Sequence, residues 1–236
     1  MPAPPSKLER PRLATRRLIL APLHPRDAGE VFAAIEESRR VLRRWLPFAA
    51  TDFDVEKTRA FIRSTGRSRS SIAWGIWERD ALAAARSGQP GSGESGGSPR
   101  GPRARPRRRP AGRFCGTLGM HQISLDQKVG TIGYWIRTPC TGQGHGTEAC
   151  AAVLLWAFSR LRLERVAVEV ASGNAPSLRV VRKLGFVREG VLRKAESIPG
   201  RRGRYDWVVL SLVRSDLFRV RGKLRAYCGT ARPWQG

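Results

Sequence analysis

The chain has 236 residues, of which 41% are hydrophobic, enough for a sizeable folded core. Its formal net charge of +25 is extreme for an ordinary enzyme. The longest apolar run, residues 149–158, is too short to cross a bilayer, and the N-terminus lacks the apolar segment of a secretory signal. We therefore expect a cytoplasmic protein with no membrane anchor.

Arginine supplies most of the positive charge, with 38 of the 44 basic residues. One interpretation is a polyanionic partner such as nucleic acid, a ribonucleoprotein, an anionic membrane or a phosphorylated cofactor. The other is an arginine excess that reflects codon usage in a GC-rich genome, because no basic stripe stands out along most of the chain. The sequence leaves both interpretations open.

The first half of the chain predicts a strand, two helices and a pair of strands. The first helix has apolar residues at helical spacing and stops at Pro47. The second helix begins at Asp54, a favourable N-cap residue. The predicted ranges are strand 16–22, helices 24–46 and 54–66, and strands 71–80 and 113–125.

Residues 81–113 stand apart from the rest in composition. Of these 33 residues, 12 are Gly or Pro and 8 are Arg, so they cannot bury a core. We expect a disordered insertion between two hairpin strands rather than a linker between domains. Its RPRRRP run, residues 105–110, is either a solvated loop or a nonspecific contact to RNA or the ribosome.

The second half predicts another strand, one strand–helix–strand crossover and two further strands. Together with the first half, this order indicates a single mixed α/β domain. The residues beyond Asp216 look basic and loosely ordered. The predicted ranges are strand 129–138, helix 147–161, strand 164–171, helix 174–185, and strands 186–194 and 204–213.

The cysteines and histidines predict no metal site. The cysteines form no C-x-x-C pair and the histidines are scattered, so neither metal-ligand spacing nor a disulfide framework is evident. We expect free, buried thiols in a reducing cytosol. These residues are Cys115, Cys140, Cys150, Cys228, His24, His121 and His145.

Three alternating glycines, Gly142, Gly144 and Gly146, stand directly before a predicted helix. Unpaired N–H groups and the dipole at a helix N-terminus favour an anion such as a phosphate, and glycine lets the backbone approach it. A tight turn is the plainer alternative. The P-loop pattern is absent because no Lys follows, and the G-x-G-x-x-A spacing of a dinucleotide fold lacks the repeated strand–helix units.

The segments GYWIRTPCTGQGHGTEA, VEVASGNAPSLRVVRKLGFVREGVLR and YDWVVLSLV resemble the GCN5-related N-acetyltransferases (GNAT). The resemblance is closest to the RimJ/RimL type, which acetylates ribosomal-protein N-termini. It covers residues 15–216 apart from the insertion and leaves 217–236 as a basic tail. It implies one α/β domain with a mixed, mostly antiparallel sheet, a splayed strand pair and flanking helices, and it implies acetyl-CoA as cosubstrate.

The family's pyrophosphate loop, [RQ]-x-x-G-x-[GA], aligns with residues 141–146. Thr141 stands where the family has Arg or Gln, whereas the glycines that allow backbone contact are kept. The resemblance also implies that the pantetheine arm lies between the splayed strands. The implied cofactor-binding residues are Trp135, Ile136, Arg137, Thr141, Gly142, Gln143, Gly144, His145, Gly146, Thr147, Asn174 and Ser177.

Two residues are candidates for proton transfer. Many relatives carry a Tyr as general acid where this chain has Val181, so the resemblance leaves Ser177 beside the coenzyme sulfur, with helix capping as its alternative role. Many relatives also carry an acidic residue where this chain has Thr131. Glu169 is the candidate base, or an ordinary outward strand residue. Glu148 is expected to complement the helix dipole.

The resemblance thus predicts an acetyl-CoA-dependent N-acetyltransferase. The expected acceptor is the N-terminal α-amine of a protein, such as a ribosomal protein. An α-amine with a pKa of about 8 needs a weaker base than a lysine side chain with a pKa of about 10.4. Two alternatives stay open: transfer to a small-molecule amine, such as an antibiotic, a polyamine or an amino acid, and a basic RNA- or ribosome-binding module that has lost catalysis.

Overall fold

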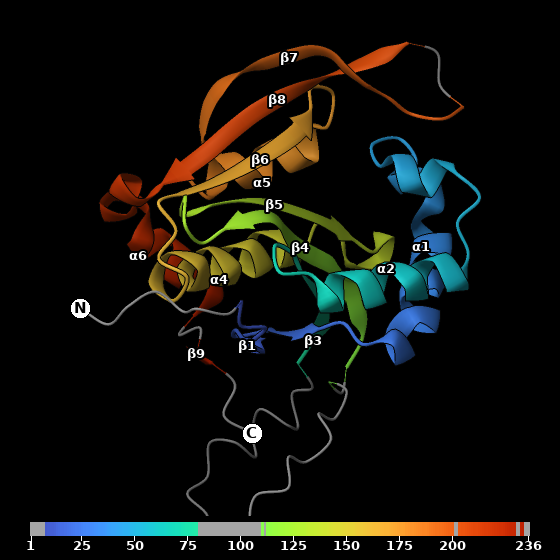
Figure 1. Ribbon diagram of the computed structural model, residues 1–236, viewed down its shortest axis with the longest axis horizontal. Helices are drawn as coiled ribbons and strands as arrows, with labels where there is room; N and C mark the ends of the chain where they lie inside the picture. Colours follow the sequence, from blue (N-terminus) through green and yellow to red (C-terminus); the bar gives the residue numbers. More distant parts are fainter. Residues whose placement is uncertain (1–7, 80–109, 111, 201–202, 230–231, 234–236) are drawn as a thin grey trace, which may run out of the picture.

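A single mixed sheet forms the centre of the computed structural model, which describes residues 8–79, 110, 112–200, 203–229 and 232–233. Its nine strands within these residues run in the order β7-β8-β6-β5-β4-β3-β2-β1-β9 (Figure 1). Neighbouring strands are antiparallel except for β5 and β6, which are parallel. The strands are β1 Leu13–Ala14, β2 Leu18–Pro22, β3 Ile72–Glu78, β4 Phe114–Ser124, β5 Val129–Ile136, β6 Arg165–Ala171, β7 Val187–Ser197, β8 Arg204–Val213 and β9 Arg232–Pro233.

Helices cover both faces of this sheet. One face packs against α1 and α2, and the other packs against α4, α5 and α6. No helix among the described residues is long and apolar enough to cross a membrane. The helices are α1 Ala28–Leu42, α2 Val55–Arg67, α4 His145–Ser159, α5 Ala175–Lys183 and α6 Leu217–Cys228.

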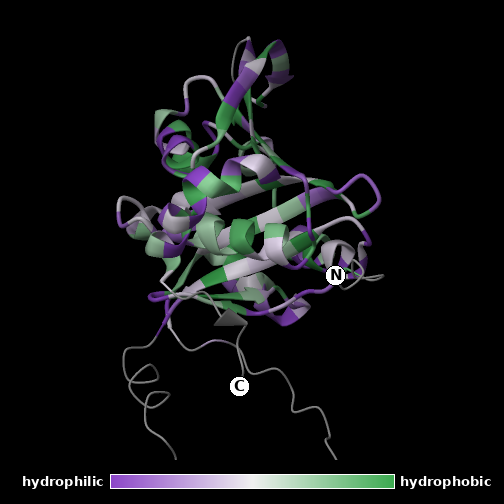
Figure 2. Ribbon diagram, turned by 90° about the vertical axis from the view of Figure 1, so that its left-hand side faces the viewer, coloured by the Kyte–Doolittle hydropathy of each residue, from purple (hydrophilic) through white to green (hydrophobic). Residues whose placement is uncertain are grey.

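The most apolar strand and the most apolar helix meet in the core. All residues of β3 except its last are buried, and α4 is buried along almost its whole length, as expected for a helix that is apolar on every side. Trp74 of β3 and Trp156 of α4 contact edge to face, with ring centroids 5.5 Å apart. Figure 2 shows the hydrophobic segments gathered toward the middle of the molecule.

The parallel pair, β5 and β6, is joined only at its beginning. Residues 129–131 of β5 pair with residues 165–167 of β6, and the two strands then diverge. Beyond that point β5 stays paired with β4, and β6 stays paired with β8. The sheet is therefore split at the end of β5, just before the glycine loop, which confirms the predicted splayed pair and the predicted fold class.

The structure corrects the expectation of a loosely ordered tail beyond Asp216. Residues 217–228 form α6, which packs against α4 and buries Val220, Leu224 and Cys228. These residues recur four positions apart, but the basic residues between them hide the pattern. Helix boundaries also differ: α4 begins at His145 rather than residue 147, and α1 begins only after a short 3₁₀ turn and ends at Leu42 rather than residue 46.

Most of the predicted insertion, namely residues 81–109 and 111, lies outside the described residues. The strands on its two sides, β3 and β4, pair antiparallel, as predicted for a hairpin. Arg113 donates to both carboxylate oxygens of Glu78, at 2.8 and 3.1 Å, and so connects the ends of the two strands. The boundaries proposed for the domain, residues 15–216 with this insertion, stay a proposal.

Candidate functional site

The glycine loop uses its glycines in two different ways. Gly142 and Gly144 have φ angles of +76° and +82°, which residues with a side chain rarely adopt. Gly146 lies in the first turn of α4, where an added Cβ would come within 3.1 Å of the ring of Tyr134. Because the N-cap Gly144 makes no side-chain capping bond, the first N–H groups of α4 are left for a ligand.

A buried carboxylate holds this helix start in place. Glu148 accepts hydrogen bonds from the Thr15 hydroxyl at 2.6 Å and from the backbone N–H of Arg17 at 2.9 Å. It also accepts from the Arg17 guanidinium at 2.7 Å, and Arg17 donates to the carbonyl of Gln143 in the loop. Glu148 was expected to complement the helix dipole. The structure gives it a second role, because its hydrogen bonds anchor α4 and the loop to the β1–β2 turn.

A cleft of about 560 Å³ opens between the glycine loop and the splayed strands. We call it the glycine-loop cleft. It brings together ten of the twelve residues that the sequence proposed for cofactor binding, and α1 and α5 supply its other walls. The ten are Trp135, Ile136, Thr141, Gly142, Gly144, His145, Gly146, Thr147, Asn174 and Ser177.

Three proposed site residues do not line this cleft. The Arg137 N–H donates to the carbonyl of Cys115, and its guanidinium donates to Glu37 at 2.6 Å on α1. Gln143 is exposed and bonds the carbonyl of Pro139 through its side chain. Glu169 is exposed on β6 and lines neither this cleft nor the second cavity described below.

The backbone of β5 faces the split through alternate residues. Arg137 bonds β4, so the antiparallel ladder directs the N–H and C=O groups of Ile136 and Tyr134 away from β4 and toward the diverging β6. Buried backbone groups need a partner. The split therefore leaves a short row of backbone donors and acceptors of β5 without a neighbouring strand.

Asn174 and Ser177 carry out the capping that their sequence pattern predicted. The Asn174 side chain accepts from the Ser177 N–H at 3.2 Å, at the start of α5. The Ser177 hydroxyl has a second neighbour, the phenol of Tyr134, at an oxygen–oxygen distance of 3.3 Å. Burial raises the pKa of Tyr134 well above its ordinary value, so this phenol keeps its proton at neutral pH.

Sequence reasoning assigned no chemistry to Tyr134. It placed the residue only within the predicted strand 129–138. The available signal was the alternation of Ile132, Tyr134 and Ile136, because β5 leads directly into the glycine loop and this face of β5 must meet the helix that follows. Only the packing of Tyr134 against Gly146 and Ser177 shows the phenol in the cleft.

A second cavity, of about 340 Å³, lies on the α1–α2 side of the sheet. We call it the apolar cavity. It shares Leu46, Tyr134 and Trp135 with the glycine-loop cleft, so the two spaces meet at β5. Aliphatic and aromatic side chains make most of its wall: Leu23, Val31, Ile35, Phe48, Phe53, Phe61, Ala73 and Leu118.

The polar lining of the apolar cavity includes one titratable imidazole. His121 of β4 lies opposite Thr131 of β5 in the ladder, so both side chains stand on the same face. Burial lowers the pKa of His121 below 6.5, which keeps the ring neutral at pH 7. His121 thus stands opposite Thr131, the position where many relatives carry an acidic residue that this chain lacks. Only the strand register reveals that His121 is there.

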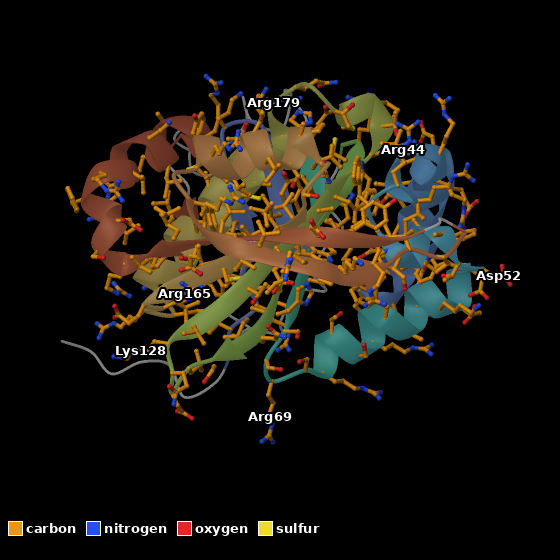
Figure 3. The ribbon with its side chains drawn as sticks, turned by 90° about the horizontal axis from the view of Figure 1, so that it is seen from above. Arg44, Asp52, Arg69, Lys128, Arg165 and Arg179 are labelled. Atoms are coloured by element: carbon orange, nitrogen blue, oxygen red, sulfur yellow. The ribbon has the colours of Figure 1, made fainter. Side chains whose placement is uncertain are left out.

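Charge is distributed unequally over these two spaces. No Asp or Glu lines either of them among the described residues. The glycine-loop cleft has Arg179 and Lys183 of α5 in its wall. Figure 3 shows Arg44, just after α1, extending toward the same edge of the molecule as Arg179. The cleft therefore suits a ligand with several phosphates, whereas the apolar cavity suits a neutral group.

A comparison of the sequence with known families gives the class of protein. Residues 17–187 match the family described as the acetyltransferase (GNAT) domain. The match spans well over half of the 236 residues, so this chain belongs to the GNAT family of acetyltransferases, which use acetyl-CoA as cosubstrate. The family, the acyltransferase class and the cosubstrate expected from the sequence are confirmed.

Similar proteins occur in Bacillus subtilis. YoaA, named an uncharacterized N-acetyltransferase, is 29% identical over 207 residues, which cover 86% of this chain and 97% of YoaA. YdaF, which its name proposes to be a ribosomal N-acetyltransferase, is 34% identical over 105 residues, covering 44% of this chain and 56% of YdaF. The chain thus spans about half the length of several curated relatives that it matches.

Solved structures share the fold. RimJ of Mycobacterium smegmatis in complex with CoA-disulfide superposes with a TM-score of 0.69 at 21% identity, covering 94% of each chain. RimL, described as a ribosomal L7/L12 alpha-N-protein acetyltransferase in complex with coenzyme A, gives a TM-score of 0.67 at 16% identity. That superposition covers 85% of this chain and 96% of RimL. At these identities the likeness concerns the fold.

Proposed function

We propose that this acetyltransferase transfers the acetyl group of acetyl-CoA to the N-terminal α-amine of a protein. The observation that carries the choice of acceptor is the lining of the apolar cavity, which contains aliphatic and aromatic side chains and no carboxylate among the described residues. A polyamine or an aminoglycoside carries several positive charges, and burying them without a counter-charge is costly. A protein N-terminus whose first residue has a small or apolar side chain carries only one amine, and the atoms beside that amine are uncharged. Such a group suits the apolar cavity.

The glycine-loop cleft fits the proposed cosubstrate in three respects. The first N–H groups of α4 would receive the pyrophosphate, and Gly142 and Gly144 allow it to approach the backbone. The exposed backbone of Ile136 and its neighbours would bond the amides of the pantetheine arm. Arg179 and Lys183 would pair with the remaining phosphate.

Thr141 does not supply the Arg or Gln that the family carries at this position of the loop. Arg17 is the nearest substitute, because its guanidinium lies 3.3 Å from the Cβ position of Gly144 and donates to the Gln143 carbonyl. Its side chain is 41% exposed, so it can turn toward an anion. We assign Arg17 as a further contact to the pyrophosphate.

The reaction joins the two spaces at β5. The amine nitrogen forms a bond to the acetyl carbon, the carbon–sulfur bond of the thioester breaks, and the coenzyme leaves as a thiolate. Two proton transfers complete the balance: the amine loses a proton, and the thiolate gains one. Holding the amine and the thioester in line supplies a large part of the acceleration.

Tyr134 and Ser177 are the proposed donors to the thiolate. Their hydroxyls are hydrogen-bonded to each other, so a proton given by one can be replaced from the other. A thiol has a pKa of about 8.5, so a phenol or hydroxyl is a sufficient acid. This pairing keeps the role proposed for Ser177 and adds the residue that can replace the tyrosine missing at Val181.

His121 is a better candidate for the base than Glu169. It lines the apolar cavity, whereas Glu169 is exposed and lines neither space. A neutral imidazole can take the amine proton directly or through water. Glu169→Gln and His121→Asn separate the two: we expect a moderate loss of turnover from the second substitution, as a weak base gives, and little from the first.

The experiment that tests the function combines calorimetry with acetyl-CoA and a mass-spectrometric acetylation assay. Peptides with a free N-terminus are compared with a panel that includes spermidine, an aminoglycoside and free amino acids. Acetylated peptide N-termini with unmodified small amines support the proposal. Preferred acetylation of a small amine overturns the acceptor assignment while leaving acetyl transfer intact, and failure to bind acetyl-CoA overturns both.

A contact to RNA or the ribosome through residues 105–110 is a separate proposal. It rests on the arginine run alone, and that run, apart from Pro110, lies outside the described residues. Nonspecific binding of this kind depends steeply on salt. A filter-binding assay with unstructured RNA at two salt concentrations, on the chain with and without residues 84–109, tests it.

A further inference from the structure

Four side chains with metal-ligating atoms meet beneath the glycine loop. We call them the four-residue cluster. One ligand atom from each lies within 4.8 Å of the others, although the four come from separate parts of the sequence. They are Glu78 at the end of β3, Cys115 near the start of β4, Cys140 in the turn after β5, and His145 at the first position of α4.

His145 lacks the hydrogen bonds that a buried imidazole needs. The residue is only 4% exposed, and its Nδ1 is buried without a partner among the described residues. Its Nε2 lies 3.7 Å from Oε1 of Glu78, beyond hydrogen-bond distance. Since buried polar atoms in folded proteins nearly always have a partner, this ring keeps the capacity to bind one.

We propose that the four-residue cluster binds one zinc ion. Two thiolates, one imidazole and one carboxylate are donors that zinc takes in tetrahedral sites, whereas magnesium and calcium prefer oxygen ligands alone. Zinc–sulfur and zinc–nitrogen bonds of about 2.3 and 2.0–2.1 Å put neighbouring ligand atoms about 3.3–3.8 Å apart. The observed limit of 4.8 Å exceeds that spacing by about 1.0–1.5 Å, so zinc binding requires the four side chains to move slightly toward one another.

The surroundings of the cluster balance its charge. Two thiolates and one carboxylate around Zn²⁺ leave a single negative charge in excess. Arg113 supplies the opposite charge, since it already donates to both oxygens of Glu78. Such an outer partner also fixes the orientation of a ligating carboxylate, which is the usual arrangement around protein-bound metals.

The position of the cluster gives the zinc a structural role. Glu78 and Cys115 stand on either side of the long connection between β3 and β4, and Cys140 and His145 stand on either side of the glycine-rich turn. One ion would close both connections at a single point, which restricts the unfolded chain. With four protein ligands no position stays open for substrate, so the ion holds the N-terminus of α4 rather than taking part in the reaction.

This arrangement has no signal in the linear sequence, because metal motifs are read from short spacings along the chain. Here the spacings are 37, 25 and 5 residues, and only the β3–β4 and β4–β5 pairings bring the four together. The inference is independent of the acceptor: a zinc clip beneath the loop is compatible with either a peptide or a small amine.

The test measures metal in the full chain. Protein expressed with added zinc, then exchanged into metal-free buffer, is expected to keep one zinc per chain by inductively coupled plasma mass spectrometry. Removal with a strong chelator is expected to lower Tm, and zinc alone to restore it. Cobalt(II) in place of zinc should give a thiolate-to-metal charge-transfer band and the visible bands of a tetrahedral site.

Two cysteine variants separate the cluster from the other buried thiols. Cys140→Ser is expected to weaken zinc binding by more than about 100-fold, since even loss of an outer partner costs about 10- to 100-fold. Cys150→Ser, a buried thiol of α4 outside the cluster, is the matched control and keeps the zinc. The cobalt spectrum of the unaltered chain needs no variant and decides the matter if either variant fails to fold.

Three results overturn the proposal. The first is an unaltered chain that holds no stoichiometric zinc, and the second is a cobalt spectrum without a thiolate band. The third is equal zinc affinity in the two cysteine variants. A Cys115–Cys140 disulfide in protein purified under mild reductant also overturns the proposal, because oxidised sulfurs cannot bind zinc.

Discussion

The phenol oxygen of Tyr134 lies 3.3 Å from the hydroxyl oxygen of Ser177. The first residue belongs to β5 and the second to α5, so the contact connects one wall of the glycine-loop cleft to the other. Tyr134 also borders the apolar cavity. The pair therefore stands where the proposed reaction would bring a thioester in the cleft and an amine in the cavity together.

Loss of either hydroxyl should reduce turnover. We expect Tyr134→Phe and Ser177→Ala each to lower kcat by about 10- to 100-fold, at the lower end of general-acid effects because a thiolate is a good leaving group. KM for acetyl-CoA should change little, since a donor that acts on the leaving group acts mainly in the transition state. Steady-state assays of thiol release measure both constants.

The double variant distinguishes one shared donor from two separate ones. If the hydroxyls act as a unit, removing both costs little more than removing the more important one. Ser159→Ala, at the end of α4 and bonded to a backbone carbonyl, is the matched control and should leave kcat unchanged. Unchanged turnover in Ser177→Ala would return that residue to helix capping alone.

Two glycines of the loop should be needed for coenzyme binding. Gly144→Val forces a β-branched residue to φ +82°, and Gly146→Val drives a side chain into the ring of Tyr134. Each should weaken acetyl-CoA binding at least about tenfold, because either the backbone turn or the first turn of α4 must move away from the phosphates. Calorimetry with acetyl-CoA measures the change.

Gly29→Ala provides the control for these substitutions. Gly29 lies in α1 with open space around its Cβ position, so alanine should be neutral or stabilising by up to about 1 kcal/mol. Acetyl-CoA binding should be unaffected. If Gly144→Val and Gly146→Val bind as well as this control, the loop is only a turn.

Glu148 should matter for stability more than a surface carboxylate does. It is 1% exposed and accepts from Thr15 and twice from Arg17, so Glu148→Gln removes an oxygen acceptor and leaves a buried donor unpaired. We expect a loss of about 1–3 kcal/mol in the free energy of unfolding by urea. Glu164→Gln, whose partner Arg214 is on the surface, should cost less than about 1 kcal/mol.

The sequence predicted those parts of the site that depend on local backbone geometry. A glycine turn before a helix and an N-x-x-S start to α5 each carry their structural reason within a few residues, and both lie where they were expected. The mixed, mostly antiparallel sheet and the splayed pair came from resemblance to a family. These parts needed no knowledge of which side chains meet across the sheet.

The remaining parts depend on register and packing. His121 lies opposite Thr131 only because β4 and β5 pair in one particular register, and a shift of one residue would turn His121 to the other face. Tyr134 reaches Ser177 only because Gly146 leaves room for its ring. Neither relation has a signal in the linear sequence. Helix α6 was missed for another reason, since its basic residues mask apolar positions that only α4 reveals as buried.

His121 should make the protein less stable in acid. Burial lowers its pKa in the folded state below the ordinary value of 6.5, so the unfolded chain takes up a proton more readily. The free energy of unfolding should therefore fall as the pH drops through and below about 6.5, and level off only below the folded-state pKa. Urea unfolding between about pH 8 and 5 measures this, and His121→Gln should flatten the slope. An equal slope in the variant would contradict the assignment.

The acceptor should be an α-amine rather than a lysine side chain. At pH 7 about one α-amine in ten is neutral, against fewer than about one lysine in a thousand. No carboxylate lines the apolar cavity among the described residues, and a neutral His121 with a lowered pKa is a weak base, so this difference should pass directly into the rate. Peptides with a free N-terminus should be acetylated, while the same peptides with a blocked N-terminus and an internal lysine should not. Activity should rise with pH toward about 8, the pKa of the acceptor itself, because His121 is already deprotonated there. A plateau near pH 6 to 7, as a carboxylate base with a raised pKa would give, or efficient acetylation of the blocked peptide at pH 7, would exclude this acceptor.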